Sequence, residues 1–383
     1  MQASSGGVYM KLIMLTGKIF LNTLYFFLKF LPTKDQIVFI SRQSNSPTLD
    51  FVMLQDEISK KCDYKIVMIT RKMKKNKKDI LKNSDVILKE MYYLATSKIC
   101  ITDGYNIPIS ILKHKKKLKI FQLWHSLGAI KKFGYQSLNS SEKKMIANIM
   151  RMHKNYDYII TGSEEMTKYF MKAFGYDETV FCPVGLPRID YINNKKNQRQ
   201  NKKAIYDQYP NFKKKKIILY VPTFRDNKNY KINELIDSIT NEEYILIVKV
   251  HPNMKVNIKR KKNIYTCDQF SSLELLSISD YIITDYSAIS IEASILEKPI
   301  YLYCYDYKEY SSYPGINTDL KKEFKDYFFT DAKKLFKKLK SGNYDINIVR
   351  EYKSKYVCNT SGTVTSNLAN LIIERGAIND KKH

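Results

Sequence analysis

Short apolar runs of strand length alternate with longer amphipathic stretches along most of the chain. We expect strands at the apolar runs and helices between them, as at 144–153 and 166–174. The expected strands are 37–40, 64–69, 86–88, 99–102, 118–123, 158–161, 180–183, 217–221, 244–250, 264–266, 281–283 and 300–303. Strands separated by helices predict parallel sheets that helices cover on both faces.

The stretch 280–306 shows this pattern most fully. A strand at 281–283 leads into a polar turn, a helix and a second strand at 299–303, which predicts a βαβ unit. The turn consists of Thr284, Asp285, Tyr286 and Ser287. Because free N–H groups and the helix dipole favour an anion at a helix N-terminus, we expect a phosphate there. The alternative is that Asp285 or Ser287 only caps the helix.

A polar and basic stretch, 191–216, has no sustained apolar period and predicts a linker between two domains. We expect a Rossmann-like domain at 36–190 and a second at 217–383, preceded by an N-terminal segment at 1–35. The predicted fold class is α/β, with two doubly wound domains facing each other across a cleft. In such sheets ligands bind beyond the carboxyl ends of the strands.

The N-terminal segment is mostly apolar from 8 to 31 but contains Lys11, Lys18 and Lys29. These lysines and Asn22 fall on one narrow stripe of a helix. The pattern predicts an amphipathic helix in the membrane interface, with lysine stems extended toward anionic headgroups. Charges in the middle argue against a spanning helix, and the lack of a clean apolar region argues against a signal peptide. The alternative is a helix packed on the domain with its lysine edge in solvent.

The charge balance adds a class of partner. Lys and Arg number 65 against 38 Asp and Glu, a net charge of +27. Such a chain attracts nucleic acid, an anionic membrane face or a phosphate-rich substrate. No nucleic-acid-binding module is visible, so nucleic acid is not an expected partner. Six widely spaced cysteines without a CxxC pair indicate a reduced, cytoplasmic protein with neither a disulfide frame nor a zinc site.

Polar side chains follow several of the expected strands. His125 follows the strand 118–123 and precedes Lys131 and Lys132. In the second domain, Thr223 and Arg225 follow the strand 217–221 and offer a hydroxyl and a guanidinium to phosphate.

His251 follows the strand 244–250, so each domain carries one histidine at a strand end. A cleft enzyme needs such a pair. One histidine would act as a base for an acceptor hydroxyl, and the other would stabilise a donor phosphate.

Several motifs resemble those of the CDP-glycerol glycerophosphotransferases, in family order and spacing, over about residues 88–310. They are QLWHSLGAIKKFG, GSEEMTKYFMKAFGYDETVFCPVGLPRID, ILYVPTFRD, VKVHPN and TDYSAISIEASILEKPIYLYCYDYKEY. The resemblance implies a GT-B fold with an acceptor domain first and a CDP-donor domain second. It also implies peripheral association with the cytoplasmic face of the cell membrane.

The implied reaction moves glycerol phosphate or ribitol phosphate from a CDP-alditol to a hydroxyl of a lipid-linked saccharide or poly(alditol phosphate), and releases CMP. The product would be a teichoic acid or a capsular polymer. His125 matches the family's proposed base, and His251 matches the histidine near the donor phosphates. The donor-binding residues implied by the motifs are Thr223, Arg225, Thr284, Asp285, Tyr286, Ser287 and Glu292, the last matching a carboxylate suited to ribose hydroxyls. The lysines expected to serve the acceptor or the membrane are Lys11, Lys18, Lys29, Lys131 and Lys132.

The chain departs from the family pattern at a few positions. Ser126 stands where Gly is usual, LGA replaces the common TP, Ala288 replaces a second serine, and Glu297 stands where Gly is common. These changes bear on acceptor choice. No DxD-like acidic pair stands at a strand end, so no obligatory metal or other cofactor is expected, and a divalent ion carried by the pyrophosphate stays open.

Two other functions remain at this point. A GT-B glycosyltransferase using a nucleotide sugar would share the histidine and serine motifs. A noncatalytic membrane scaffold would have no need for both His125 and His251. Glycerol and ribitol donors, and primase and polymerase roles, are not distinguished by any residue.

Overall fold

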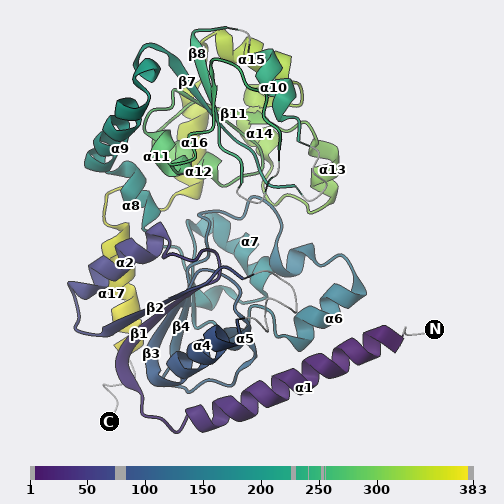
Figure 1. Ribbon diagram of the computed structural model, residues 1–383, viewed down its shortest axis with the longest axis vertical. Helices are drawn as coiled ribbons and strands as arrows, with labels where there is room; N and C mark the ends of the chain where they lie inside the picture. The colour runs from purple at the N-terminus through teal and green to yellow at the C-terminus, as the bar shows by residue number, and fades with distance from the viewer. Residues whose placement is uncertain are drawn as a thin grey trace. The chain divides into compact units, whose positions relative to one another are not determined.

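The computed structural model describes residues 5–73, 83–225, 230–239, 241–251, 254 and 256–377. The chain divides into two units (Figure 1). The first unit comprises Met1–Ser126, Phe133–Arg188 and Thr363–His383, and the second comprises Leu127–Lys132 and Ile189–Gly362. Of the motif residues, Asp226, Pro252 and Asn253 lie outside the described residues.

The first unit is built on six parallel strands within the described residues, in the order β2-β1-β3-β4-β5-β6. The strands are β1 (Lys34–Ser41), β2 (Lys65–Thr70), β3 (Ser97–Thr102), β4 (Lys119–Gln122), β5 (Tyr158–Ile160) and β6 (Phe181–Cys182). The central strands are buried on both faces, and residues 37–40 of β1 have no exposed surface. Continuous apolar runs therefore produce a sheet covered by helices, as expected.

The helices of the first unit follow the strands in sequence. They are α1 (Ser5–Leu28), α2 (Leu49–Ser59), α4 (Ser84–Thr96), α5 (Ile107–Ile111), α6 (Ser141–Ile149), α7 (Glu164–Phe174) and α17 (Val364–Ala377), with 3-10 turns η1 (Gly134–Ser137) and η2 (Glu178–Val180). Local chemistry sets the ends of α7. The Ser163 side chain accepts a hydrogen bond from the Met166 N–H, and Gly175 ends the helix at φ 68°.

The second unit has the same architecture, again with six parallel strands in the part of the chain that the structure describes. Their order is β12-β11-β10-β7-β8-β9. The strands are β7 (Lys216–Val221), β8 (Tyr244–Val248), β9 (Ile264–Tyr265), β10 (Tyr281–Thr284), β11 (Ile300–Tyr303) and β12 (Phe328–Phe329). The pairing of β10 with β7 and β11 brings the turn after β10 beside the loops that follow both neighbours.

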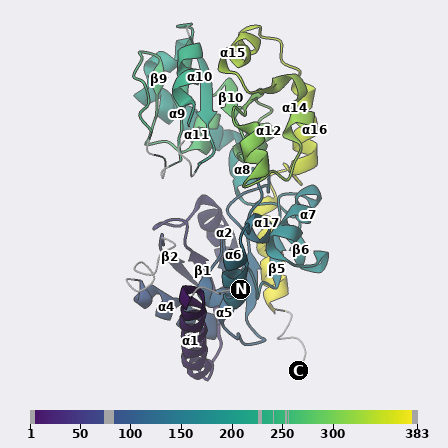
Figure 2. The same cartoon turned by 90° about the vertical axis from the view of Figure 1, so that its right-hand side faces the viewer.

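Helices flank this second sheet, and Figure 2 shows α12, α14 and α16 together on one side of it. The helices are α9 (Lys195–Gln208), α10 (Ile232–Ser238), α11 (Ser272–Leu276), α12 (Ile289–Ile295), α13 (Tyr307–Ser312), α14 (Leu320–Phe324), α15 (Ala332–Lys340) and α16 (Ile346–Tyr356), with 3-10 turns η3 (Pro210–Lys214) and η4 (Lys325–Tyr327). Helix α8 (Arg188–Asn193) begins at the last residue of the first unit's middle segment. The predicted βαβ unit is confirmed as β10, α12 and β11.

One expectation about secondary structure is wrong, and one short strand was missed. Residues 86–88, expected as a strand, lie inside α4, because their apolar run is one turn of a helix that buries Ile87, Met91 and Leu94. The short strand β12 was not expected, because two residues carry no periodicity.

The unit boundaries differ from the expected ones. The stretch 191–216 is largely helical and belongs to the second unit, where α9 buries only Ile205 and therefore shows no apolar period. Helix α17 returns to the first unit and packs on α2 (Figure 1). Its Leu368 and Ile372 have no exposed surface.

Because α17 completes the core of the first unit, Leu368→Ala should lower the free energy of unfolding by about 2–5 kcal/mol, the usual cost of a core cavity. Urea denaturation measures this change. Asn370→Ala, on the exposed face of the same helix, is the matched control. A loss no larger than that of the control would show that α17 adds nothing to the core.

Candidate active site

His125 stands at the carboxyl end of β4, where Trp124 turns the chain. The Trp124 N–H donates to Gln122 Oε1 (2.8 Å), and Trp124 adopts the left-handed φ of 58°. A tryptophan in this conformation is strained, and its packing must compensate. Its ring stacks on Phe133, with centroids 4.8 Å apart, and meets Phe174 edge-on at 5.2 Å. The cluster fixes the backbone from which His125 projects.

The imidazole of His125 is exposed, and its Nδ1 lies 3.1 Å from the backbone oxygen of Asp103. A carbonyl oxygen can only accept, so Nδ1 is the donor in this bond. In the neutral ring Nε2 then carries the lone pair. This tautomer suits a general base that receives a proton through Nε2.

Asp103, at the end of β3, is a buried carboxyl that the sequence analysis did not single out. Its Oδ2 accepts from Ser41 Oγ (2.8 Å), whereas Oδ1 is buried without a hydrogen-bond partner among the described residues. Burial and, to a smaller extent, the charge of Asp50 raise the pKa of Asp103 to about 7, although the bond from Ser41 and the charge of Arg188 oppose the shift. The sequence signal that could have identified Asp103 is its position directly after a strand.

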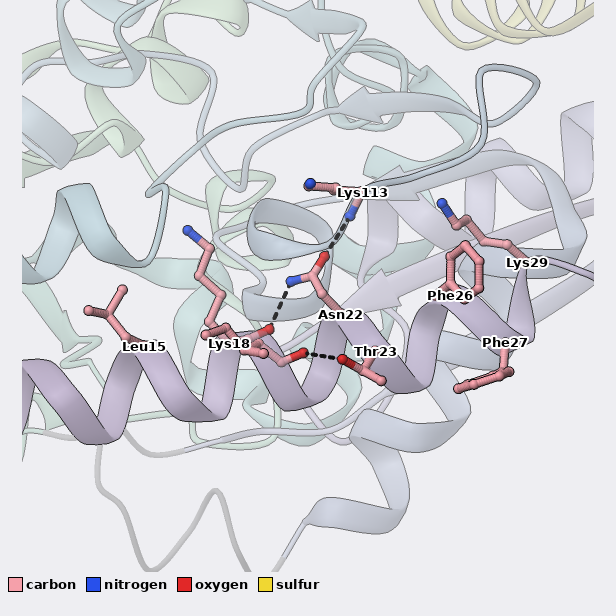
Figure 3. A pocket seen from close by; sticks show the side chains of 9 residues that line it. Leu15, Lys18, Asn22, Thr23, Phe26, Phe27, Lys29 and Lys113 are labelled. Atoms are coloured by element: carbon pink, nitrogen blue, oxygen red, sulfur yellow. Dashed lines mark hydrogen bonds between the residues drawn. The ribbon is translucent and has the colours of Figure 1, made fainter.

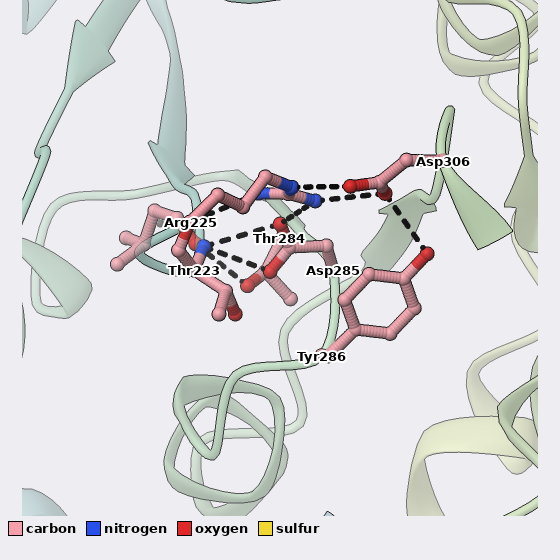
Figure 4. Close-up of polar contacts among 7 residues, drawn as sticks. Thr223, Arg225, Thr284, Asp285, Tyr286 and Asp306 are labelled. Carbon is pink, nitrogen blue, oxygen red and sulfur yellow. Dashed lines mark hydrogen bonds and ion pairs between the residues drawn. The ribbon is translucent and has the colours of Figure 1, made fainter. Parts of the chain in front are cut away.

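In the second unit, a buried ion network joins the ends of β7, β10 and β11 (Figure 4). Arg225 donates from Nε to Asp306 Oδ2 (2.5 Å) and from Nη2 to Asp306 Oδ1 (3.0 Å), and its Nη2 lies 2.9 Å from Asp285 Oδ2. Arg225 Nη1 also donates to the Thr223 oxygen (2.9 Å), and the Thr223 N–H donates to Asp285 Oδ1 (2.9 Å). Arg225 and Asp285 are both buried.

Tyr286 extends this network. Its ring is buried and stacks on Tyr310 with centroids 4.0 Å apart, and its hydroxyl donates to Asp306 Oδ1 (3.1 Å). Burial raises the pKa of Tyr286, so the phenol stays neutral and keeps its proton for this bond. Thr284 Oγ1 donates to the Val221 oxygen (2.8 Å), a further tie between β10 and β7.

The predicted donor residues are therefore brought together, but Thr223, Arg225 and Asp285 bond to one another. Asp285 does not cap α12, because its carboxylate oxygens bond to Thr223 and Arg225. The N-cap residue is Ala288, and no side chain caps it. Ser287 stays partly exposed at this edge, and Glu292 lies buried on α12. Direct contact of these residues with a donor remains a prediction.

His251 follows β8 and is exposed, with its ring centroid 5.5 Å from that of Phe224. Its backbone oxygen accepts from the Met254 N–H (2.8 Å). His251 therefore stands at the same carboxyl edge of the second sheet as the ion network, since β8 pairs with β7 in parallel.

The lysine stripe of α1 lies differently from the expectation. Lys18 Nζ donates to the Ile149 oxygen (3.1 Å), Asn22 Nδ2 donates to the Ile111 oxygen (3.1 Å), and Tyr25 hydrogen-bonds His114 Nδ1 (2.9 Å). The polar edge of α1 thus faces the rest of the first unit, because the backbone carbonyls of Ile149 and Ile111 lie beside it. A local sequence pattern does not reveal these carbonyls. Lys11 is exposed, and Lys29 lies over the Phe26 ring.

The other face of α1 is apolar and exposed. Its large exposed side chains are Tyr9, Leu12, Ile13, Ile19, Phe20, Phe26 and Phe27, and Phe30 and Leu31 follow the helix. The segment Tyr9–Leu28 has a mean hydropathy of 1.3 and, by length and composition alone, could cross a membrane.

Since the pKa of Asp103 is raised above the unfolded value of about 3.9, the native state holds an extra proton between about pH 4 and 7. The contribution of Asp103 to stability should therefore fall as pH rises through this window. The side chain at position 103 cannot titrate in Asp103→Asn. The unfolding free energy of this variant minus that of the wild type should therefore be more positive at pH 8 than at pH 5. Urea titrations at both values measure this, with Asp56→Asn on the exposed surface of α2 as control. A constant difference between wild type and Asp103→Asn would contradict the assignment.

Comparison with known proteins agrees with this architecture. The sequence profile of CDP-Glycerol:Poly(glycerophosphate) glycerophosphotransferase matches residues 23–374. A teichoic acid glycerol-phosphate primase of Bacillus subtilis (strain 168) is 38% identical over 246 residues, 61% of this chain and 63% of that protein. A teichoic acid ribitol-phosphate primase of Bacillus spizizenii (strain ATCC 23059 / NRRL B-14472 / W23) is 29% identical over 292 residues, 72% of this chain and 74% of that protein.

A solved structure of a variant of the wall teichoic acid polymerase TagF has the same fold, with a TM-score of 0.74 at 18% identity over 98% of this chain and 99% of that one. This match confirms the predicted GT-B fold class. The alignment with the Bacillus subtilis primase spans slightly less than two thirds of that protein. The profile match covers most of the chain, which therefore belongs to the CDP-glycerol:poly(glycerophosphate) glycerophosphotransferase family.

Proposed function

We propose that this protein transfers glycerol phosphate or ribitol phosphate from a CDP-alditol to a hydroxyl of a membrane-linked acceptor, and releases CMP, in teichoic acid synthesis. Family membership supports the reaction class, and relatives named as glycerol-phosphate and ribitol-phosphate primases support both donors. The observation that carries the proposal is His125, an exposed imidazole whose Nδ1 is engaged by a backbone carbonyl.

His125 supplies the base. The acceptor hydroxyl attacks the distal phosphorus of the donor while His125 Nε2 takes its proton. The new bond joins the acceptor oxygen to phosphorus, and the bond from that phosphorus to the bridging oxygen breaks. The bonding electrons leave with CMP. A base positioned in this way contributes about 10² to 10⁴ in rate.

His251 acts on the donor side. It is exposed at the carboxyl edge of the second sheet, where Ser287 is also partly exposed. An imidazolium or N–H donor there stabilises charge on the phosphates as CMP departs. Arg225 acts as a positioning residue, because its guanidinium is buried against Asp285 and Asp306.

No metal ion is obligatory in this proposal. Asp285 and Asp306 are the carboxylates nearest the donor edge in the ion network, and both bond to Arg225. A divalent ion would therefore arrive with the pyrophosphate of the donor and not on a preformed set of protein ligands.

His125→Ala should lower kcat by about 10² to 10⁴ and leave donor binding intact, because the imidazole acts on the acceptor hydroxyl. His251→Ala should lower kcat and also weaken donor binding. CMP release from CDP-glycerol and CDP-ribitol, with a lipid-linked saccharide acceptor in detergent, measures turnover. Circular dichroism confirms that each variant folds. Turnover within threefold of the wild type in either folded variant would remove that histidine from the mechanism.

The protein binds the cytoplasmic face of the membrane through α1, which in this proposal lies in the plane of the interface. The contacts of Lys18, Asn22 and Tyr25 hold one edge of α1 on the first unit, and a spanning helix would have to break them. The opposite, apolar face would enter the headgroup region.

A groove along α1 supports the proposal that the membrane surface is anionic. Lys18, Lys29 and Lys113 line it together with Phe26 and Phe27 (Figure 3). Burial lowers the pKa of Lys18, and the positive charges of Arg151 and Lys113 lower it further. Positive charges beside an exposed apolar face attract anionic headgroups.

Replacing Phe20, Phe27 and Phe30 together with Ser should weaken binding to phosphatidylglycerol vesicles more than tenfold, because each buried aromatic contributes about 1.5–3 kcal/mol. Cosedimentation with vesicles measures the binding. The control replaces Val52 and Tyr313, which are exposed apolar residues outside α1, with Ser. If the triple variant sediments with vesicles as the wild type does, α1 is not the membrane contact.

A further inference from the structure

The segment Leu127–Lys132, here called the strap, follows His125 in sequence but belongs to the second unit. It pairs with residues 315–317. The Lys132 N–H donates to the Gly315 oxygen (2.9 Å), and the Asn317 N–H donates to the Ile130 oxygen (2.7 Å). Lys131 and Ile316 form an antiparallel bridge between these two bonds. The strap therefore joins the second unit through an isolated antiparallel β-bridge.

Two further contacts fix the strap. Asn317 Nδ2 donates to the Ala129 oxygen (2.8 Å). Gly315 has a φ of +94°, and a Cβ there would lie 2.8 Å from Lys132 Cδ, so the lysine stem passes directly over the glycine. Contacts to residues 315–317 thus hold the backbone on both the N-terminal and the C-terminal side of Lys131.

The loop that receives the strap is continuous with the ion network. The Gly315 N–H donates to the Tyr310 oxygen (2.9 Å), and the Tyr310 ring stacks on Tyr286. Tyr286 in turn bonds to Asp306, which bonds to Arg225. The strap therefore brings Lys131 to the edge where β7, β10 and β11 end.

Lys131 differs from Arg225 in what its charge contacts. The Lys131 side chain is exposed, and among the residues described by the structure its ammonium forms no hydrogen bond or ion pair. Surrounding protein lowers the pKa of Lys131 by desolvation, the charge of Asp285 raises it, and the charge of Arg225 lowers it. An accessible, partly desolvated cation that lies near the charge of Asp285 without pairing with it is suited to an added anion.

We propose that Lys131 binds the diphosphate of the nucleotide donor. This inference rests on the proposed function and replaces, for Lys131, the acceptor or membrane role expected from sequence. The ammonium acts as a point charge on the phosphate oxygens and stays with the CMP phosphate as the bridging bond breaks. Asp285, Arg225 and Asp306 hold the edge and the strap in place without touching the donor.

Titration calorimetry of the full chain with CDP and with cytidine tests this proposal. Lys131→Ala should weaken CDP binding about 10- to 100-fold, the range for a charge-assisted contact, and should leave cytidine binding within about twofold. Lys131→Arg should restore most of the CDP affinity, because it keeps the charge.

Lys340→Ala is the matched control. Lys340 is an exposed lysine of the same unit at the end of α15, and the nearby Tyr344 bonds to the oxygen of Ile300, the first residue of β11. Lys340 therefore stands at the opposite edge of the sheet from the strap. The CDP affinity of Lys340→Ala should equal that of the wild type.

Three outcomes would overturn the inference. Unchanged CDP affinity in Lys131→Ala would show that the ammonium does not contact phosphate. Equal losses for CDP and cytidine, with a lowered Tm, would show that Lys131 only balances the charge of Asp285. If the wild type binds CDP and only the lysine prediction fails, the proposed function stands. If the wild type binds no CDP, the CDP-alditol donor is itself wrong and the inference falls with it.

Discussion

The second unit depends on one buried cation held between two carboxylates. Arg225 follows β7, Asp285 follows β10 and Asp306 follows β11, so their ion pairs join three loops at one edge of the sheet. The guanidinium carbon also lies 4.6 Å from the centroid of the Tyr305 ring. Removing one partner from such a buried network costs about 3–5 kcal/mol, because the remaining charges stay buried without compensation. The arrangement is therefore costly to lose and fixes the loops that carry the chemistry.

This constraint divides the polar residues of the edge into two groups. Asp285, Arg225 and Tyr286 point into the network and form the frame. Ser287, His251 and Lys131 keep accessible surface, and a ligand can reach them. The first unit shows the same division. Trp124 is held by an aromatic cluster, and the adjacent His125 is exposed with its tautomer set by the Asp103 carbonyl.

Much of the fold followed from local pattern, because a strand buried on both faces reads as a continuous apolar run. The run 281–283 and its polar turn predicted β10 and the turn at its carboxyl end. The expected strands 118–123 and 244–250 placed His125 and His251 at strand ends. Pattern failed where a helix leaves only a weak or ambiguous apolar signal, and where the deciding contacts are distant in sequence. Residues 86–88 form part of a helix that buries Ile87, Met91 and Leu94, and α9 shows no period because it buries a single apolar side chain. The role of Lys131 could not be inferred either, since only tertiary structure shows that the strap joins the second unit.

Position at a strand end predicts that a residue lies at the edge, but it does not predict whether the side chain faces the ligand or the frame. Asp285 and Ser287 are two residues apart in one turn, yet one is fully buried and the other partly exposed. The polar stripe of α1 was read correctly as a stripe, but its direction was set by carbonyls of Ile111 and Ile149, which are far away in sequence.

The most direct test of the account follows the distal phosphorus of the donor. CDP-glycerol labelled at that phosphorus is incubated with the protein and a lipid-linked acceptor, and the label is traced to acceptor or nucleotide. Phosphotransfer with His125 as base predicts that the label moves to the acceptor and that unlabelled CMP is released. Label that stays in the nucleotide as CDP, with glycerol alone transferred, would contradict the account and place the chemistry at carbon.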